Sequence, residues 1–209
     1  MMKVAVIGAT GNAGSRITAE LLKRGHHVRA IVRSENNITA KNGLEVAKSD
    51  LSDATQLAGV LKGAEAVVSA YRPPVDDNDQ IVGTTKRITQ AVKENKQRLL
   101  VVGGAGGLFV APGVTAIASG HLPDFALPIA KAHEQVRQDL EGSGADWTYF
   151  APAGLFEPGE RTGKFRLGKD DLIVDASGNS RISMEDYAIA AVDELERPQH
   201  RGERFTIGY

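Results

Sequence analysis

The sequence predicts an α/β fold in which helices cover both faces of a parallel sheet, and two observations carry this prediction. Short apolar runs alternate along the chain with amphipathic stretches, which is the pattern of strands and helices in such a sheet. The first run, Lys3–Ile7, is largely apolar without alternation, as expected of a strand that is buried on both faces. Similar runs predict further strands at 28–32, 44–47, 66–70, 99–102 and 147–150.

Helices are predicted between these strands. The segment 14–24 carries Ile17, Leu21 and Leu22 at helical spacing, and Gly25 is a typical stop signal after its last turn. The same periodicity predicts helices at 53–61, 80–93 and 127–140.

After Pro152 the chain changes to short polar and apolar pieces separated by turns. A last helix is predicted at 184–195, where Ser183 is a candidate N-cap with Asp186 three residues on, and a last strand at 205–207. We therefore expect a single domain over 1–209, in which residues from about 152 form a small C-terminal lobe that covers a cleft.

Composition excludes several classes of protein. The 25 Lys and Arg residues nearly balance the 26 Asp and Glu residues, which argues against a nucleic-acid or membrane-surface protein. The absence of cysteine removes disulfides, Cys-ligated metals and thiol nucleophiles, and no histidine pair has metal spacing. The uncharged stretch 99–123 is broken by glycines and prolines, so we expect no membrane span. The missing cysteines and histidine pairs lead us to expect no metal, and the missing cysteines fit a cytoplasmic location.

The strongest motif is the glycine-rich turn after the first strand. It has the spacing G-x-x-G-x-x-G and opens the first helix, which is the context of a dinucleotide-binding turn in a Rossmann-type, doubly wound sheet. The helix N-terminus would offer unpaired N–H groups to the phosphates. The alternative is a glycine-rich turn without a ligand. The predicted cofactor contacts in this turn are Gly8, Thr10, Gly11, Asn12, Ala13 and Gly14.

The end of the second strand bears on which cofactor binds. Arg33 and Ser34 stand where NAD enzymes usually carry an acidic residue, and Glu35 comes one step late. Arginine is a bidentate partner for a 2′-phosphate, so we expect NADP(H), with NAD(H) as an alternative. Asp50 and Leu51, past the third strand, are candidates for the adenine edge, although Asp50 is also a plausible turn or cap residue.

The ends of the fourth and fifth strands complete the predicted site. Ala70 and Tyr71 end one strand, and Gly103 and Gly104 end the other. Both pairs therefore reach the carboxyl edge of the sheet, where ligands bind in such folds. Tyr71 has the alternative of a partly exposed loop aromatic.

Together with these motifs, the chain resembles the bacterial NADH–flavin reductases, which are NmrA-like members of the atypical short-chain dehydrogenases/reductases. A more distant similarity links it to biliverdin-IXβ/flavin reductase. The resemblance implies a Rossmann domain that binds NAD(P)H, with Pro152 at the cofactor, and a shallow pocket for a flavin or quinone. The segments that carry it are 6–14, 100–106, 130–132, 152–163 and 204–206.

Two departures from the superfamily disfavour ordinary alcohol–carbonyl chemistry. The superfamily uses a Tyr-x-x-x-Lys pair, but here Lys131 is preceded four residues earlier by Leu127, and Gly106 and Gly107 stand where a catalytic serine would lie. Helical spacing places Lys131 opposite the face of Ile129, Ala132, Val136 and Leu140, which should pack on the sheet. Lys131 is thus the candidate catalytic residue, as a partner of the nicotinamide ribose, or else a solvated lysine.

The functional hypothesis is hydride transfer from NADPH to a flavin or quinone that binds as a substrate rather than as a resident cofactor. The loop 104–126 and the segment 154–162 would form a lid. His121 is a weaker proton-donor candidate, and His133 is expected on the surface. The alternative function is a non-catalytic NADP(H)-binding redox sensor; an epimerase is disfavoured by the missing Tyr-x-x-x-Lys pair. We expect a small-molecule partner and a monomer or homodimer.

Overall fold

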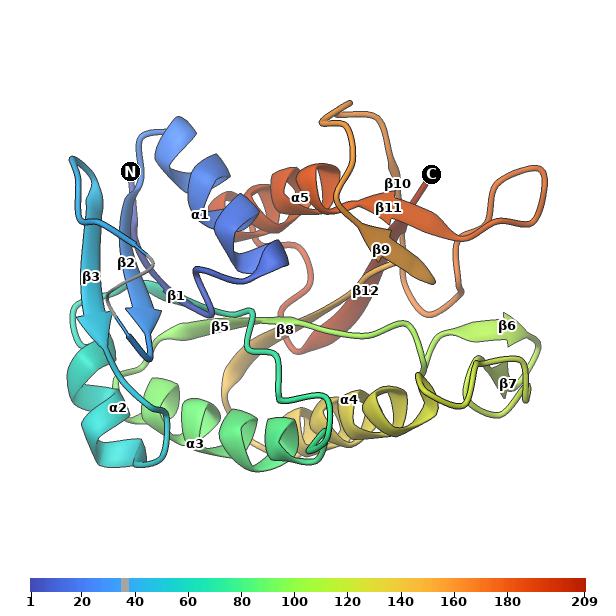
Figure 1. The fold of residues 1–209 in the computed structure, drawn as a ribbon, viewed down its shortest axis with the longest axis horizontal. Coiled ribbons are helices and arrows are strands. Elements are labelled where there is room, and N and C mark those ends of the chain that lie inside the picture. The colour runs from blue at the N-terminus through green and yellow to red at the C-terminus, as the bar shows by residue number, and fades with distance from the viewer. Residues whose placement is uncertain (35–37) are drawn as a thin grey trace.

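The computed structural model describes residues 1–34 and 38–209, which form a three-layer α/β structure around one large sheet (Figure 1). Seven of its strands are parallel, and the edge strand β10 runs antiparallel to its neighbour. Across the sheet the order is β10 (Arg166–Gly168), β12 (Glu203–Gly208), β8 (Asp146–Ala151), β5 (Arg98–Val102), β4 (Ala66–Ser69), β1 (Lys3–Ile7), β2 (His27–Val32) and β3 (Leu44–Lys48).

Helices cover both faces of the sheet. One face carries α1 (Asn12–Lys23) and α5 (Met184–Glu196), and the other carries α2 (Ala54–Leu61), α3 (Gln80–Glu94) and α4 (Leu127–Glu141) (Figure 1). Two apolar clusters, one for each face, form the core. The chain reverses its direction of winding between β1 and β4, so the predicted doubly wound, Rossmann-type fold is confirmed.

The central strands show why the sequence folds in this way. Val4, Ala5 and Val6 of β1 are all fully buried, because helices cover both sides of this strand. Ile17 and Leu21 of α1 lie in the core cluster of one face, as their helical spacing predicts. No helix within residues 1–34 and 38–209 is both long and apolar enough to cross a membrane.

Two small sheets lie outside the central one and were not predicted. β6 (Phe109–Ala111) and β7 (Val114–Thr115) form a hairpin inside the expected loop 104–126, and β9 (Leu155–Glu157) pairs with β11 (Arg181–Ser183). Each strand is three residues long or shorter, which is too short to show an alternating pattern. The hairpin is fixed to the segment after β10, where Phe109 donates to the carbonyl of Asp170 at 2.8 Å.

The C-terminal part of the chain contributes to the main layers as well as to the expected lobe. β12 lies between β8 and β10 in the central sheet, and α5 packs on α1. Ser183 caps α5 as predicted, because its hydroxyl accepts the N–H of Asp186 at 3.0 Å. Arg161 joins this region to α1 through an ion pair of 2.8 Å with the buried carboxylate of Glu20.

Candidate functional site

Two adjoining pockets lie at the carboxyl edge of the sheet, where β1, β4 and β5 end. We call them the narrow pocket, of about 160 Å³, and the wide cleft, of about 350 Å³. Ala70, Tyr71 and Arg72 belong to the walls of both, so the two form one continuous groove across the sheet. This is the position at which ligands bind in open α/β sheets.

The glycine-rich turn forms the floor between the two pockets. Gly8 has a φ of +76°, and a Cβ atom at this position would overlap the carbonyl oxygen of Ala70. A Cβ atom at Gly14 would overlap the carbonyl oxygen of Gly8, since α1 begins directly against the turn. The N–H of Gly11 closes the turn on the Gly8 carbonyl at 2.9 Å. Close packing of strand, turn and helix therefore requires glycine at Gly8 and Gly14.

The N-terminus of α1 is open to an anion. The helix begins at Asn12, two residues earlier than predicted, and its N-cap Gly11 has no side chain to accept the first N–H groups. No acidic residue lies in the first turn. The helix dipole and the first-turn N–H groups therefore favour a negatively charged group here. Thr10 and Gly11 line the narrow pocket, and Asn12 and Ala13 line the wide cleft.

The narrow pocket carries two arginine side chains. Arg33, which was predicted, and Arg72, which was not, both line it, and both are exposed. Within the described part of the chain neither arginine has a hydrogen bond or an ion pair, whereas most other arginines do. Two unpaired guanidinium groups at one pocket favour the binding of a phosphate group there. Ser34 does not line the pocket, and Glu35 lies outside the described residues.

Leu51 lines the narrow pocket, but Asp50 does not. Leu51 has a φ of +63°, and its carbonyl accepts a hydrogen bond of 2.7 Å from Arg87. The Asp50 carboxylate accepts both the hydroxyl, at 2.6 Å, and the N–H, at 2.9 Å, of Ser52. These bonds lower the pKa of Asp50 and form an Asx turn, which is the turn role that the sequence left open.

Gly103 and Gly104 line the wide cleft. At each position a large side chain occupies the space that a Cβ atom would need. A Cβ atom at Gly103 would overlap the ring of Tyr149, and one at Gly104 would lie 3.1 Å from Cγ of His133. The Tyr149 hydroxyl accepts the N–H of Gly104 at 2.9 Å and donates to the His133 carbonyl at 3.2 Å. Burial raises the pKa of Tyr149, so its hydroxyl stays protonated and donates.

The packing of α4 also explains the missing serine. A Cβ atom at Gly106 would lie 2.8 Å from Cβ of Ala130, and one at Gly107 would overlap the carboxylate of Glu134. The strand-to-loop turn is therefore pressed against the helix, and it leaves no room for a hydroxymethyl group. Gly106 lines the cleft with its backbone alone.

Lys131 does not lie at the site. It is exposed and does not line either pocket, so the structure does not bring this candidate to the cofactor groove. Ala132, Val136 and Leu140 are buried against the sheet as predicted. Ile129, however, faces the cleft together with Ala126, Ala130 and His133. The cleft is thus lined by the face of α4 that carries Ile129 and His133, and not by the face that carries Lys131.

His133, expected on the surface, lines the wide cleft, and sequence reasoning missed it. Its ring is half-buried, and its Nδ1 atom is buried without a hydrogen-bond partner in the described part of the chain. Burial lowers the pKa of His133 to about 4, so the imidazole is neutral at pH 7. Helical spacing places His133 on the side of Ile129, so the sequence could have shown it only if Ile129 had been assigned to the cleft.

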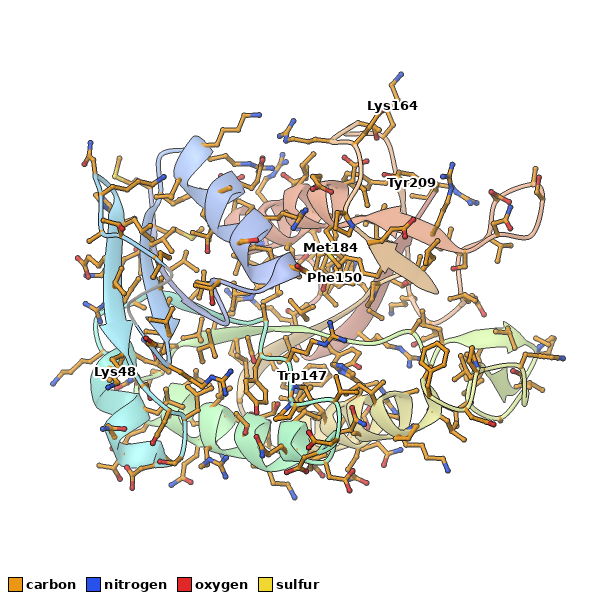
Figure 2. All side chains as sticks on the ribbon, in the orientation of Figure 1. Lys48, Trp147, Phe150, Lys164, Met184 and Tyr209 are labelled. Carbon is orange, nitrogen blue, oxygen red and sulfur yellow. The ribbon has the colours of Figure 1, made fainter. Side chains whose placement is uncertain are left out.

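The rest of the wide cleft is largely apolar. Figure 2 shows Met184, one of its lining residues, between α1 and β9. Leu122 comes from the loop 104–126 and Phe156 from the segment 154–162, so both expected lid segments border the cleft. Pro152, a predicted cofactor contact, also lines the cleft. The groove thus gathers most predicted cofactor residues but not Gly14, which lies behind the turn, or Ser34, Asp50 and Lys131.

Comparison with known proteins agrees with this geometry. Residues 8–198 match the family described as NAD(P)H-binding. The YwnB protein of Bacillus subtilis (strain 168) is 40% identical over 211 residues, which cover 99% of this chain and 98% of that protein.

Two solved structures are similar over the whole chain. A Bacteroides thetaiotaomicron protein provisionally described as an epimerase has a TM-score of 0.92 at 45% identity, covering 100% of this chain and 97% of that one. A Streptococcus pneumoniae protein provisionally described as an NADH-flavin reductase has a TM-score of 0.91 at 36% identity, covering 100% and 99%. The chain belongs to the NAD(P)H-binding family, and these similarities are consistent with the NmrA-like, atypical short-chain dehydrogenases/reductases that the sequence resembles.

Proposed function

We propose that the protein is an NADPH-dependent reductase that transfers hydride to a flavin or quinone bound as a substrate. The observation that carries this proposal is the continuous groove, in which an arginine-lined pocket leads past a helix N-terminus into an apolar cleft. A dinucleotide has its charged groups at one end and in the middle, and a flat, weakly polar ring at the other. The residues present therefore fit NADP(H) along the groove.

The chain's own residues bind and orient the reactants. The first turn of α1 would hold the pyrophosphate with its N–H groups, next to the glycine turn. NADPH supplies the hydride, so that with one proton from water the acceptor gains two electrons and NADP⁺ leaves. Gly103 and Gly104 expose backbone at the cleft floor, so that flat rings can approach closely. Phe156 and Met184 exclude water from one side.

The choice of acceptor follows from what the cleft does not offer. Reduction of a ketone to an alcohol requires an acid beside the substrate oxygen. The superfamily's tyrosine and serine positions hold Leu127 and Gly106 in this chain. Leu127 does not line the cleft and Gly106 has no side chain, so neither position donates a proton there. A flavin or quinone needs less help, because its reduced oxygen or nitrogen atoms take their protons from water. The Streptococcus pneumoniae protein that is provisionally described as an NADH-flavin reductase, and that is similar over the whole chain, supports the same class of acceptor.

The unpaired Arg33 and Arg72 favour NADP(H) over NAD(H). Both guanidinium groups line the narrow pocket, where the 2′-phosphate of an adenosine end would lie. The absence of cysteine is compatible with a reducing cytoplasm, where we place the reaction. The proposed partner is the small aromatic acceptor alone.

Consumption of NADPH by the purified protein tests the proposal. Absorbance of the reduced nicotinamide is followed with NADPH or NADH, each without acceptor and with FMN, riboflavin or a naphthoquinone. The proposal predicts acceptor-dependent oxidation that is faster with NADPH than with NADH. NADPH that binds tightly but is not oxidised with any acceptor would favour the redox sensor instead.

A further inference from the structure

His133 is the polar side chain that α4 presents to the wide cleft. It lies one helical turn after Ile129 and beside Gly104, whose missing Cβ leaves room for the imidazole ring. Its backbone is held in place, because the Tyr149 hydroxyl joins the His133 carbonyl to the N–H of Gly104. The backbone that carries the ring therefore has a fixed position in the wall of the cleft.

This imidazole lacks a partner. Its Nδ1 atom is buried without a hydrogen bond in the described part of the chain, although a buried polar atom without a bond costs about 1–3 kcal/mol. The ring is neutral at pH 7, since burial holds its pKa near 4. The other ring nitrogen, Nε2, also has no hydrogen bond in the described part of the chain but is not buried, so it is the atom that a ligand in the cleft can reach. In a neutral imidazole one nitrogen donates and the other accepts, so Nε2 can bond to an uncharged carbonyl or ring N–H, depending on the tautomer.

The wall around His133 offers little to a charged ligand. Ile129, Phe156 and Met184 are apolar. Among the described residues that line the cleft, Arg72 is the one side chain besides His133 that can carry a positive charge. Arg72 also borders the narrow pocket, where the cofactor phosphates are expected. A charged tail on the acceptor would therefore find no partner near His133.

We propose that His133 is a specificity-determining contact of the acceptor, which it binds by a hydrogen bond to a carbonyl or ring N–H of a planar, uncharged ring system. This inference rests on the proposed function and deepens it. It implies that the cleft recognises the ring of a flavin or quinone and not the phosphate of FMN. Lumiflavin and riboflavin should then serve as well as FMN.

The test combines binding and turnover. Lumiflavin is titrated into the protein saturated with NADP⁺, and its Kd is measured by quenching of flavin fluorescence. The variant His133→Phe keeps the ring volume but removes the hydrogen bond, and we expect it to raise the lumiflavin Kd and the acceptor KM about tenfold. His133→Gln, which retains a donor and an acceptor, should recover part of this loss.

Two controls distinguish the loss of the His133 hydrogen bond from a general loss of structure in the variants. Gln135→Ala changes an exposed residue of the same helix whose side chain donates to Asp139, and it should leave both constants unchanged. The NADPH Kd should be the same in all variants. In the wild-type protein, kcat/KM for FMN and riboflavin should agree within about threefold. The FMN phosphate can gain at most one weak, solvent-exposed ion pair in the cleft.

Each outcome decides a separate point. An unchanged lumiflavin Kd in His133→Phe, or a preference of more than about tenfold for FMN over riboflavin, would overturn this inference. Failure of the proposed function looks different, because NADPH would then bind without being oxidised by any acceptor. The lumiflavin titration does not depend on turnover, so it would still test His133 in that case.

Discussion

The hydroxyl of Tyr149 in β8 donates a hydrogen bond of 3.2 Å to the carbonyl oxygen of His133 in α4. The same hydroxyl accepts the N–H of Gly104 at 2.9 Å. One buried side chain thus links the sheet, the loop after β5 and the helix that together form the wide cleft. The positions of Gly104 and His133 in the wall of the wide cleft both depend on it.

Tyr149→Phe should therefore weaken the fold and loosen the cleft. The substitution leaves the N–H of Gly104 without its partner, and we expect it to lower the free energy of unfolding by about 1–3 kcal/mol. Urea denaturation measures this loss. Tyr71→Phe is the matched control, because the Tyr71 hydroxyl bonds to the exposed Gln80, and its removal should cost less than about 0.5 kcal/mol.

Gly8→Ala should abolish cofactor binding. The added methyl group would overlap the carbonyl oxygen of Ala70 and would also be strained at a φ of +76°. Gly25→Ala is the control, since Gly25 has a φ of +80° but no atom within 4 Å of an added Cβ. It should cost about 1–2 kcal/mol of stability and leave the NADPH Kd unchanged. Equal NADPH binding by both variants would refute the role of the turn.

Arg33→Ala and Arg72→Ala should each lower the preference for NADPH. Loss of one charge-assisted contact to a phosphate is expected to raise the NADPH Kd about tenfold, whereas the NADH Kd should change little. Titration of nicotinamide fluorescence measures both. Arg197→Ala, at an exposed arginine that lines neither pocket of the groove, controls for net charge. A similar loss for NADH would show that neither arginine reads the 2′-phosphate.

Lys131→Ala should leave turnover within about twofold of the wild-type rate. Lys131 is exposed and does not line the groove, so its removal changes no contact there. Steady-state NADPH oxidation checks this expectation. A loss of a hundredfold would restore Lys131 as the partner of the nicotinamide ribose.

Acid should destabilise the protein partly through His133. The pKa of His133 is about 4 in the folded protein and near 6.5 in the unfolded chain, so the unfolded chain binds more protons between these values. The stability is complete above pH 6.5 and falls as the pH drops towards 4. We expect His133 to account for about 2 kcal/mol of the free energy of unfolding that is lost over this pH range, after allowance for its contact with solvent. His133→Phe should lose less stability over this range than the wild-type protein does.

Sequence reasoning predicted the parts of the site that depend on local chain geometry. The turn from Gly8 to Gly14 has its spacing fixed by one strand and one helix that are adjacent in sequence. Arg33 and the glycines after β5 were found because strand ends in a parallel sheet meet at one edge. These features need no knowledge of distant contacts.

The parts that were missed depend on distant contacts. An apolar residue in α4 packs equally well on a sheet or in a cleft wall, so the spacing alone assigned Ile129 to the wrong surface and left His133 outside the site. Arg72 stands before two prolines in a loop, where an arginine is usually solvated. β9 and β11 form only because residues far apart in sequence pair beside the cleft.

A single-turnover experiment tests the central claim most directly. Protein in excess over NADPH is mixed rapidly with riboflavin without oxygen, and the absorbances of nicotinamide and flavin are followed together. The account predicts that both decrease at one rate, much faster than in a mixture without protein, and that C4-deuterated NADPH slows the decrease. NADPH that stays bound and reduced would contradict the account.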